Sequence, residues 1–273
     1  MFMSRFSFEI CDLWSFERSE IKILENNNYE LYQGDCINLM KDIPDKSIDM
    51  VLCDLPYGTT ACKWDVIIPF EDLWEQYNRI IKDNGAIVLF GSEPFSSALR
   101  LSNLKMYKYD WYWKKERPTN IFQVKRRPAK YCETISVFYK KQCTYNETKV
   151  ASSGRIVKNN PKGSHSITTA LNQIKVTPYE DDGTRHPCEI LEFKRDVQTC
   201  RLHPTQKPVA LLEYLIKTYT NKGEVILDNT MGSGSTGVAA LNTNRKFIGM
   251  ELDEKYFNLA SNRINEVSQT LAK

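Results

Sequence analysis

An acid, a proline and an aromatic residue follow directly on a short apolar run. The run covers residues 50–53, with Ile48 before it, and Asp54, Leu55, Pro56 and Tyr57 come after it. Such a run is typical of a strand buried on both faces of a sheet. At the carboxyl end of that strand, a carboxylate can accept a proton or a hydrogen bond, and a ring can stack on a flat substrate. An ordinary strand followed by a turn explains the same residues, so the choice depends on the rest of the chain.

A glycine-rich pattern stands near the carboxyl end of the chain. Asp228 precedes the sequence Gly-Ser-Gly-Ser-Thr-Gly at residues 232–237, and Glu251 ends the next predicted strand. Between a strand and a helix, such glycines let the backbone approach a ligand, and the later acid can bind the two hydroxyls of a ribose. The pattern predicts an adenosine-containing cofactor, with a glycine-rich turn that binds nothing as the simpler alternative. The acids favour free ribose and a nearby cationic group, which fits S-adenosylmethionine.

The middle of the chain is strongly basic, although the net charge of the whole chain is only +3. Residues 105–158 contain fourteen Lys or Arg, four Asp or Glu, and ten aromatic residues. Basic side chains interleaved with rings predict a nucleic-acid surface, because the charges contact phosphates and rings stack on bases. We expect Tyr109, Trp111 and Trp113, which alternate along a predicted strand, to pack in the core instead. The predicted DNA contacts are Lys114, Lys115, Arg117, Lys125, Arg126, Arg127 and Lys130.

Hydrophobic periodicity predicts alternating strands and helices at both ends of the chain. The predicted strands cover residues 29–33, 48–53, 86–90, 107–113, 133–140, 190–193, 224–227 and 247–250. The predicted helices begin at residues 36, 70, 94, 208, 235 and 254, and the second of them covers residues 70–82 and is stopped by Asn84-Gly85. This alternation predicts an α/β fold with a mainly parallel sheet, interrupted by a polar and basic insertion.

The length of 273 residues suits one large domain with an insertion. We expect an N-terminal arm (1–28), a catalytic half (29–113), a last sheet strand with the inserted target-recognition region (114–200) and a cofactor-binding half (201–273). No apolar run approaches the ~20 residues of a membrane span. The first ten residues lack the apolar centre of a signal peptide, so we expect a cytoplasmic protein.

These motifs together resemble those of DNA amino-methyltransferases. Residues 54–57 resemble the D-P-P-Y motif, residues 228–234 resemble the cofactor loop, and residues 203–208, HPTQKP, match a segment that precedes that loop in the β class. Gly34-Asp35-Cys36 and Ile43-Pro44-Asp45 also fall where that class has them. The order of catalytic motif, variable region and cofactor loop is that of the β class. The resemblance covers about residues 29–140 and 200–268, and implies a Rossmann-like, S-adenosylmethionine-dependent methyltransferase of prokaryotic or phage origin.

The resemblance also implies a role for each matching residue. Asp54 and the backbone carbonyl of Leu55 would accept hydrogen bonds from the amine of the target base, beside Pro56, and Tyr57 would stack on that base after it is flipped out of the duplex. The residues implied in cofactor binding are Asp35, Cys36, His203, Thr205, Lys207, Asp228, Met231, Gly232, Gly234 and Glu251.

One residue departs from the family pattern, because Leu55 stands where the motif has its first proline. The backbone acceptor survives this change, but a conformational restriction is lost. Asp at position 54 favours adenine N6 as the methylated atom. The alternatives are cytosine N4 on the same fold, and a nucleic-acid-binding protein that has lost turnover.

The remaining expectations concern metals and partners. His186, Cys188, Cys200 and His203 could be written as four zinc ligands. Because the resemblance already assigns His203 to the cofactor side, we expect no metal. Double-stranded DNA is the expected partner, and a homodimer or a cognate restriction nuclease is compatible with the resemblance.

Overall fold

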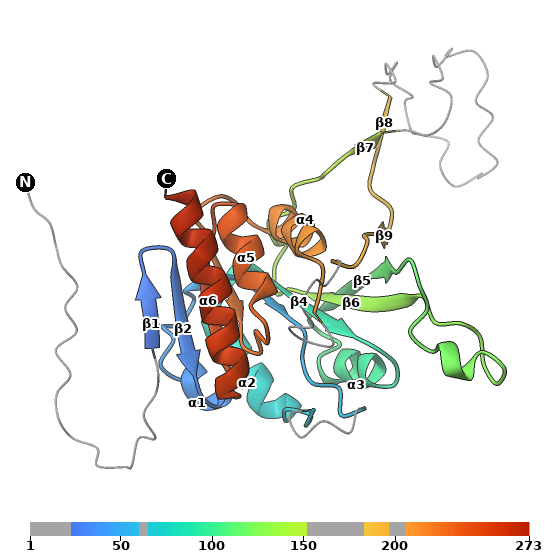
Figure 1. Ribbon diagram of the computed structural model, residues 1–273, viewed down its shortest axis with the longest axis horizontal. Helices are drawn as coiled ribbons and strands as arrows, with labels where there is room; N and C mark the ends of the chain where they lie inside the picture. The colour runs from blue at the N-terminus through green and yellow to red at the C-terminus, as the bar shows by residue number, and fades with distance from the viewer. Residues whose placement is uncertain (1–22, 60–64, 152–182, 197–205, 273) are drawn as a thin grey trace, which may run out of the picture.

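The structure is a computed structural model that describes residues 23–59, 65–151, 183–196 and 206–272 (Figure 1). The strands are β1 (Ile23–Asn26), β2 (Tyr29–Gln33), β3 (Ile48–Cys53), β4 (Ile81–Gly91), β5 (Tyr107–Lys114), β6 (Cys132–Phe138), β7 (Val150–Ala151), β8 (Thr184–Arg185), β9 (Ile190–Glu192), β10 (Val225–Asp228) and β11 (Lys246–Glu251). The helices are α1 (Cys36–Met40), α2 (Phe70–Ile80), α3 (Phe95–Ser102), the 3-10 helix η1 (Ile121–Gln123), α4 (Val209–Tyr219), α5 (Ser235–Asn242) and α6 (Glu254–Leu271).

Nine of the strands in the described part of the chain form one sheet, in the order β1-β2-β11-β10-β3-β4-β6-β5-β9. Strands β2, β11, β10, β3 and β4 are parallel to one another. Strand β6 is antiparallel to both β4 and β5, so β5 runs in the same direction as β4. The carboxyl ends of β3, β4, β5, β10 and β11 therefore meet at one edge of the sheet, where α/β proteins bind ligands.

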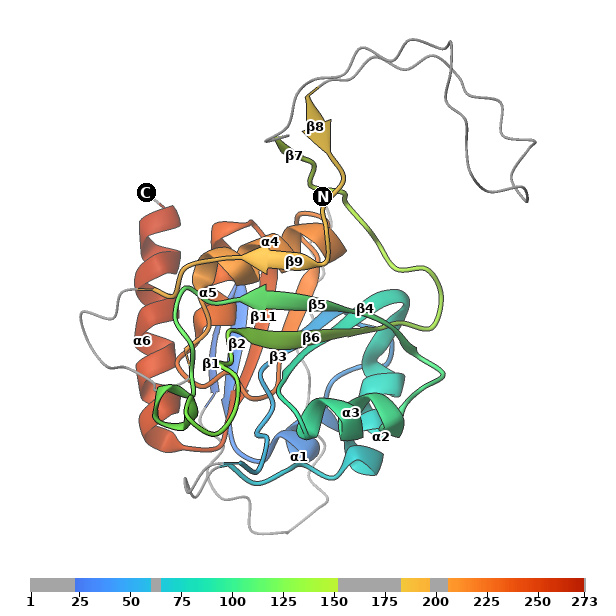
Figure 2. The same cartoon turned by 90° about the vertical axis from the view of Figure 1, so that its right-hand side faces the viewer.

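Helices cover both faces of the sheet (Figure 2). One core cluster joins the sheet to α4, α5 and α6, and a second joins it to α1, α2 and α3. Strand β3 lies in the middle and all six of its residues are buried. Met50 and Leu52 face the first cluster, whereas Val51 and Cys53 face the second. The apolar run before Asp54 is explained by this two-sided burial, because successive side chains of a strand point to opposite faces.

The end of α2 differs from the prediction. The helix ends at Ile80 and β4 begins at Ile81, so Asn84 and Gly85 lie inside the strand. The pairing of β3 with β4 shifts between Ile81 and Ala86, which leaves the intervening residues irregular. A Cβ at Gly85 would lie 2.8 Å from the Asp49 carbonyl oxygen. The glycine is thus needed for close contact with β3, rather than to end the helix.

Of the aromatic residues of β5 that were predicted to pack in the core, Trp111 and Trp113 lie within it and the half-buried Tyr109 packs against it. Trp111 and Trp113 are buried. Their indole N–H groups donate to the Tyr219 hydroxyl at 2.6 Å and to the Phe193 carbonyl at 2.9 Å. The predicted strand at residues 190–193 is also present as β9, which extends the sheet beside β5. At the other edge, the last residues of the expected N-terminal arm form β1 and pair with β2. No helix in the described ranges combines the length and apolar composition needed to cross a membrane.

Candidate active site

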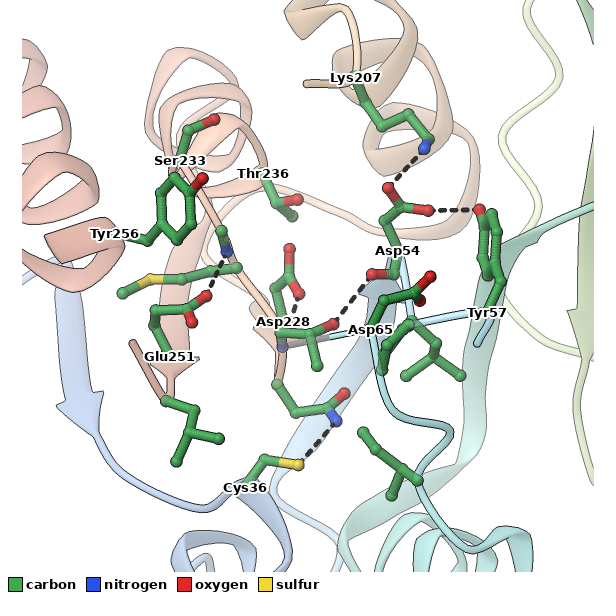
Figure 3. A pocket seen from close by; sticks show the side chains of 18 of the residues that line it. Cys36, Asp54, Tyr57, Asp65, Lys207, Asp228, Ser233, Thr236, Glu251 and Tyr256 are labelled. Atoms are coloured by element: carbon green, nitrogen blue, oxygen red, sulfur yellow. Dashed lines mark hydrogen bonds and ion pairs between the residues drawn. The ribbon is translucent and has the colours of Figure 1, made fainter. Parts of the chain in front are cut away.

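One cavity of about 590 Å³ lies at the carboxyl edge of the sheet. Asp54 and Tyr57 line it after β3, and Asp228 and Glu251 line it at the ends of β10 and β11 (Figure 3). The two chemical patterns of the sequence are distant in the chain but open into the same space. A group bound by one pattern can therefore react with a group bound by the other.

Both carboxylate oxygens of Asp54 are held by hydrogen-bond donors. The Tyr57 hydroxyl donates to Oδ1 at 2.5 Å, and the Lys207 ammonium donates to Oδ2 at 2.5 Å. Burial, reinforced by the Asp54 charge, raises the pKa of Tyr57 well above its ordinary value, so the phenol keeps its proton and remains a donor. The two donors fix the orientation of the carboxylate, and each of its oxygens retains a second lone pair for a ligand.

Lys207 lies on the catalytic side of the cavity, whereas the sequence analysis placed it with the cofactor. Its Nζ atom is 2.5 Å from Asp54 and 3.4 Å from Glu133. Glu133 is in turn ion-paired with Lys115. Burial alone would lower the pKa of Lys207, but the carboxylates of Asp54 and Glu133 raise it overall. Two cations and two anions therefore alternate in this buried network, and each charge offsets the desolvation of its neighbours.

The turn after Asp54 is held by side chains elsewhere in the chain. The Thr230 hydroxyl donates to the Asp54 carbonyl at 3.2 Å. The Asp65 carboxylate accepts from the backbone N–H groups of Gly58 and Thr59 at 2.8 and 2.9 Å. Leu55 itself is buried in the core. These contacts supply the restriction that the missing proline at position 55 would otherwise provide, so the substitution leaves an ordered turn.

The ring of Tyr57 packs beside the first residue of α3. Its centroid lies 5.0 Å from that of Phe95, with the two rings inclined by 31°. Tyr57 is only partly buried and lines the cavity, so one side of it can meet a ligand. The arrangement suits a flat aromatic substrate placed against Asp54.

Glu251 and Asp228 form the acidic side of the cavity. Glu251 accepts from the backbone N–H groups of Gly232 and Asp253, both at 2.9 Å. Burial raises the pKa of Glu251, and it raises the pKa of Asp228 to about 7. Two buried carboxylates whose charged forms are disfavoured would gain from hydroxyl donors or a cationic group. This pair of acceptors therefore fits S-adenosylmethionine, which carries ribose hydroxyls, an ammonium and a sulfonium.

Gly234 brings the start of α5 close to this cavity. It caps the helix with a φ of +76°, a conformation that favours glycine. A Cβ there would lie 2.9 Å from the Cβ of Ala260 on α6. The buried side chains of Ser235 and Thr236 in the first turn of α5 also line the cavity. The glycine thus allows both the turn and the contact of α5 with α6.

A polar network missed by the sequence analysis lies below the cofactor side. The Asn229 amide oxygen accepts from the Tyr77 hydroxyl at 2.6 Å and from the Cys53 thiol at 2.8 Å, and its NH₂ group lies 3.5 Å from the Cys36 sulfur. Burial raises the pKa of Cys36 to about 11, so this thiol is neutral. The network joins β3, α1 and α2 to the loop after β10, and it stabilises the position of that loop.

The other predicted cofactor residues are only partly placed. Asp35, Cys36, Met231 and Gly232 all line the cavity. The Asp35 carboxylate also caps α1, accepting from the Asn38 N–H at 2.9 Å. His203 and Thr205 lie outside the described residues. Further lining residues that the sequence analysis missed are Asp65, Glu133, Ser233, Thr236 and Tyr256. Glu133 and Asp65 belong to no motif, so the sequence carries no signal for them.

The predicted DNA contacts divide into surface and buried residues. Arg117, Lys125, Arg126 and Arg127 are exposed, and Lys130 is partly buried and contacts Ser92. Lys114 is exposed and forms an ion pair with Glu192 at 2.7 Å. Lys115 is buried and was placed wrongly on the DNA surface. Because side chains alternate along a strand, Lys115 lies on the same face as Trp111 and Trp113 and points inward to Glu133.

Of the four residues considered as zinc ligands, the structure describes His186 and Cys188. His186 contacts Glu147, and Cys188 is exposed. Cys200 and His203 lie outside the described residues. Among the described residues, no group of three or more His, Cys, Asp or Glu is arranged to hold a metal ion.

The sequence of this chain matches a known protein family. The model of a family described as DNA methylase, N6_N4_Mtase, matches residues 48–262. The Type II methyltransferase M2.MboI of Moraxella bovis is 26% identical over 90% of this chain and 91% of its own. The Type II methyltransferase M.HinfI of Haemophilus influenzae is 26% identical over 87% of this chain and 68% of its own.

Solved structures share the fold. The crystal structure of the M1.HpyAVI–SAM complex aligns with a TM-score of 0.58 at 26% identity, over 87% of this chain and 99% of the other. The PvuII DNA methyltransferase (cytosine-N4-specific) aligns with a TM-score of 0.62 at 17% identity, over 89% of this chain and 92% of the other. The predicted methyltransferase fold is thereby confirmed.

Proposed function

Because the chain belongs to the family of N6- and N4-specific DNA amino-methyltransferases, we propose that it methylates the exocyclic N6 of adenine at a specific DNA sequence, using S-adenosylmethionine. One observation carries the proposal. The fixed carboxylate of Asp54 opens into the same cavity as the acidic cofactor side formed by Asp228 and Glu251. Asp as the first residue of the motif supports adenine as the target base.

The chemistry requires a better nucleophile than a free base provides. The lone pair of an exocyclic amine is delocalised into the ring, so the amine reacts poorly. Asp54 and the Leu55 carbonyl would accept hydrogen bonds from its two N–H groups and draw the nitrogen toward a tetrahedral geometry. The lone pair then becomes available for in-line attack. This is catalysis by positioning and electrostatics, with no covalent bond to the protein.

The cofactor supplies an electrophilic methyl group when it is bound. Glu251 would accept from the ribose hydroxyls, and Asp228 would lie near the cationic part. Gly232 and Gly234 permit the close approach of the backbone. As the amine nitrogen gains the methyl group it must lose a proton, and Asp54, which would already accept a hydrogen bond from that amine, would take it.

The substrate base must leave the duplex to reach Asp54, because the amine is inaccessible within the base stack. Tyr57, supported by Phe95, would stack on the flipped base. A planar ring held beside the carboxylate fixes the distance between amine and methyl group. The reaction therefore depends on Tyr57 for binding and on Asp54 for activation.

The test is single-molecule sequencing of genomic DNA from a methylation-free host that expresses this protein. We expect N6-methyladenine within one short sequence. N4-methylcytosine would overturn the assignment of the base while leaving the family activity in place. DNA without modification, from cells in which the protein is folded and binds cofactor, would favour a nucleic-acid-binding protein without turnover.

A further inference from the structure

The loop between β5 and β6, residues 115–131, ends in an apolar tip. Phe122 at the tip is fully exposed (102%), and Ile121 and Val124 beside it are 56% and 49% exposed. Figure 1 shows this loop in green, extending beyond the ends of β5 and β6 away from the body of the molecule. Apolar side chains gathered on a projecting loop mark a surface that contacts a partner.

The tip is held in place by the loop's own hydrogen bonds. The Asn120 side chain donates to the Pro128 carbonyl at 2.8 Å and accepts from the Lys130 N–H at 2.7 Å. The backbone of Thr119 also bonds to Lys130 at 3.0 Å, and η1 forms the turn that carries Phe122. The exposure of Phe122 is therefore part of a built turn, and it does not result from a lack of local structure.

The loop lies at the same edge of the sheet as the active site. Strand β5 runs parallel to β4, so its carboxyl end meets those of β3 and β10. Lys115 and Thr119 at the start of the loop line the active-site cavity, as does Glu133 just after it. A duplex that delivers a base to Asp54 would therefore pass close to this loop.

The charge beside the tip identifies the partner. Lys125, Arg126 and Arg127 follow Val124 directly, and all three are exposed. A second copy of this chain would bring the same charges to a shared contact, and like charges repel. DNA offers phosphates for the cations and, between its base pairs, an apolar space for a ring.

We propose that this loop tip is a wedge that inserts Phe122 into the base stack next to the target base, an inference that rests on the proposed function. The ring would occupy space that the flipped base vacates, while the cations of residues 125–127 hold the phosphates on either side. Apolar wedges in other DNA-binding proteins unstack base steps in this way. The wedge would stabilise the flipped state without touching the reacting atoms.

This proposal predicts a particular dependence on base pairing. A paired target must be unstacked and unpaired, whereas a target opposite an abasic site has already lost its pairing partner. Removal of the Phe122 ring should therefore slow methylation of the paired duplex much more than methylation of the duplex with the abasic site. A residue with a merely structural role would affect both substrates equally.

The experiment compares Phe122→Ala with wild type in single-turnover assays, using duplexes that carry the sequence found by genomic sequencing. We expect the rate on the paired duplex to fall at least about tenfold, and the rate on the abasic duplex to fall less than about threefold. The matched control is Leu104→Ala, because Leu104 is 61% exposed and precedes the opposite end of β5. It should leave both rates unchanged.

Several outcomes would overturn the wedge. Equal rates for Phe122→Ala and wild type on both duplexes would do so, as would an equal loss on both. Loss of a dimer in light scattering, with unchanged dependence on pairing, would assign the tip to a second copy of the chain. A wild-type protein that methylates neither duplex would contradict the proposed function itself, and with it the wedge.

Discussion

Lys207→Met tests the buried charge network most severely. The substitution keeps a long apolar side chain but removes the cation between Asp54 and Glu133. The Asp54 and Glu133 carboxylates, which are 24% and 15% exposed, are then left with a single cation, Lys115. Because Lys207 is 8% exposed, water cannot easily replace the lost charge.

The magnitude follows from this burial. Removing one partner of a buried ion pair costs about 3–5 kcal/mol of stability, because the other charge is left without compensation. Lys114→Met is the matched control, since Lys114 is ion-paired with Glu192 on the surface and is 51% exposed. That pair should contribute less than about 1 kcal/mol. Adding Asp54→Asn to Lys207→Met leaves the Glu133–Lys115 pair intact and its charges balanced, and should recover part of the loss.

The loss should also depend on pH, with a sign that the structure fixes. In the wild type the cations lower the pKa of Glu133, so this group adds stability above its unfolded pKa and loses that contribution as pH falls. Without Lys207, burial should raise the pKa of Glu133, so that its contribution is lost as pH rises. The difference between wild type and Lys207→Met should therefore grow with rising pH, starting near the unfolded pKa of about 4.3.

Urea unfolding at several pH values measures this difference directly. Equal stability of Lys207→Met and the Lys114→Met control would contradict this prediction. A difference between wild type and Lys207→Met that does not change with pH would also contradict it, as would a further loss when Asp54→Asn is added to the Lys207→Met variant.

The remaining predictions concern the cofactor and the DNA. Glu251→Gln should weaken S-adenosylmethionine binding by about 1.5–3 kcal/mol, because it removes a charged acceptor for hydroxyl groups; calorimetry that finds no change would remove Glu251 from the site. Burial raises the pKa of Asp228 to about 7, so the affinity for this cationic cofactor should increase between about pH 6 and pH 8 as the carboxylate ionises. Binding titrations of Asp228→Asn should not show this increase. A wild-type affinity that does not change with pH would contradict the placement of Asp228 beside the cofactor. Replacing Arg126 and Arg127 by Gln should reduce the slope of log K against log salt by about two units; an unchanged slope would place the DNA surface elsewhere.

Local sequence patterns predicted those parts of the molecule that local physics determines. The burial of β3 on both faces follows from its apolar run, and the turn at Gly234 follows from the conformational freedom of glycine. The end of α2 could not be predicted in the same way. The role of Gly85 depends on how β4 is aligned with β3, and that pairing is not encoded in a short stretch.

The active site shows the same division. Asp54 and Glu251 were predicted because motifs surround them. The ion pair of Lys207 with Asp54 could not be predicted, because it joins segments distant in the chain. Lys115 is a different case, because a signal was present. The alternation that buries Trp111 and Trp113 also places position 115 on the inner face, so a basic residue there is buried if the strand pattern continues.

The central claim is that Asp54 directs methyl transfer to adenine N6. Mass spectrometry of nucleosides, from unmethylated genomic DNA incubated with S-adenosylmethionine and either wild type or Asp54→Asn, tests it most directly. We expect N6-methyladenine with the wild type and none with Asp54→Asn, while both proteins bind the cofactor within about tenfold of each other. Undiminished N6-methyladenine from Asp54→Asn, or N4-methylcytosine from the wild type, would contradict the claim.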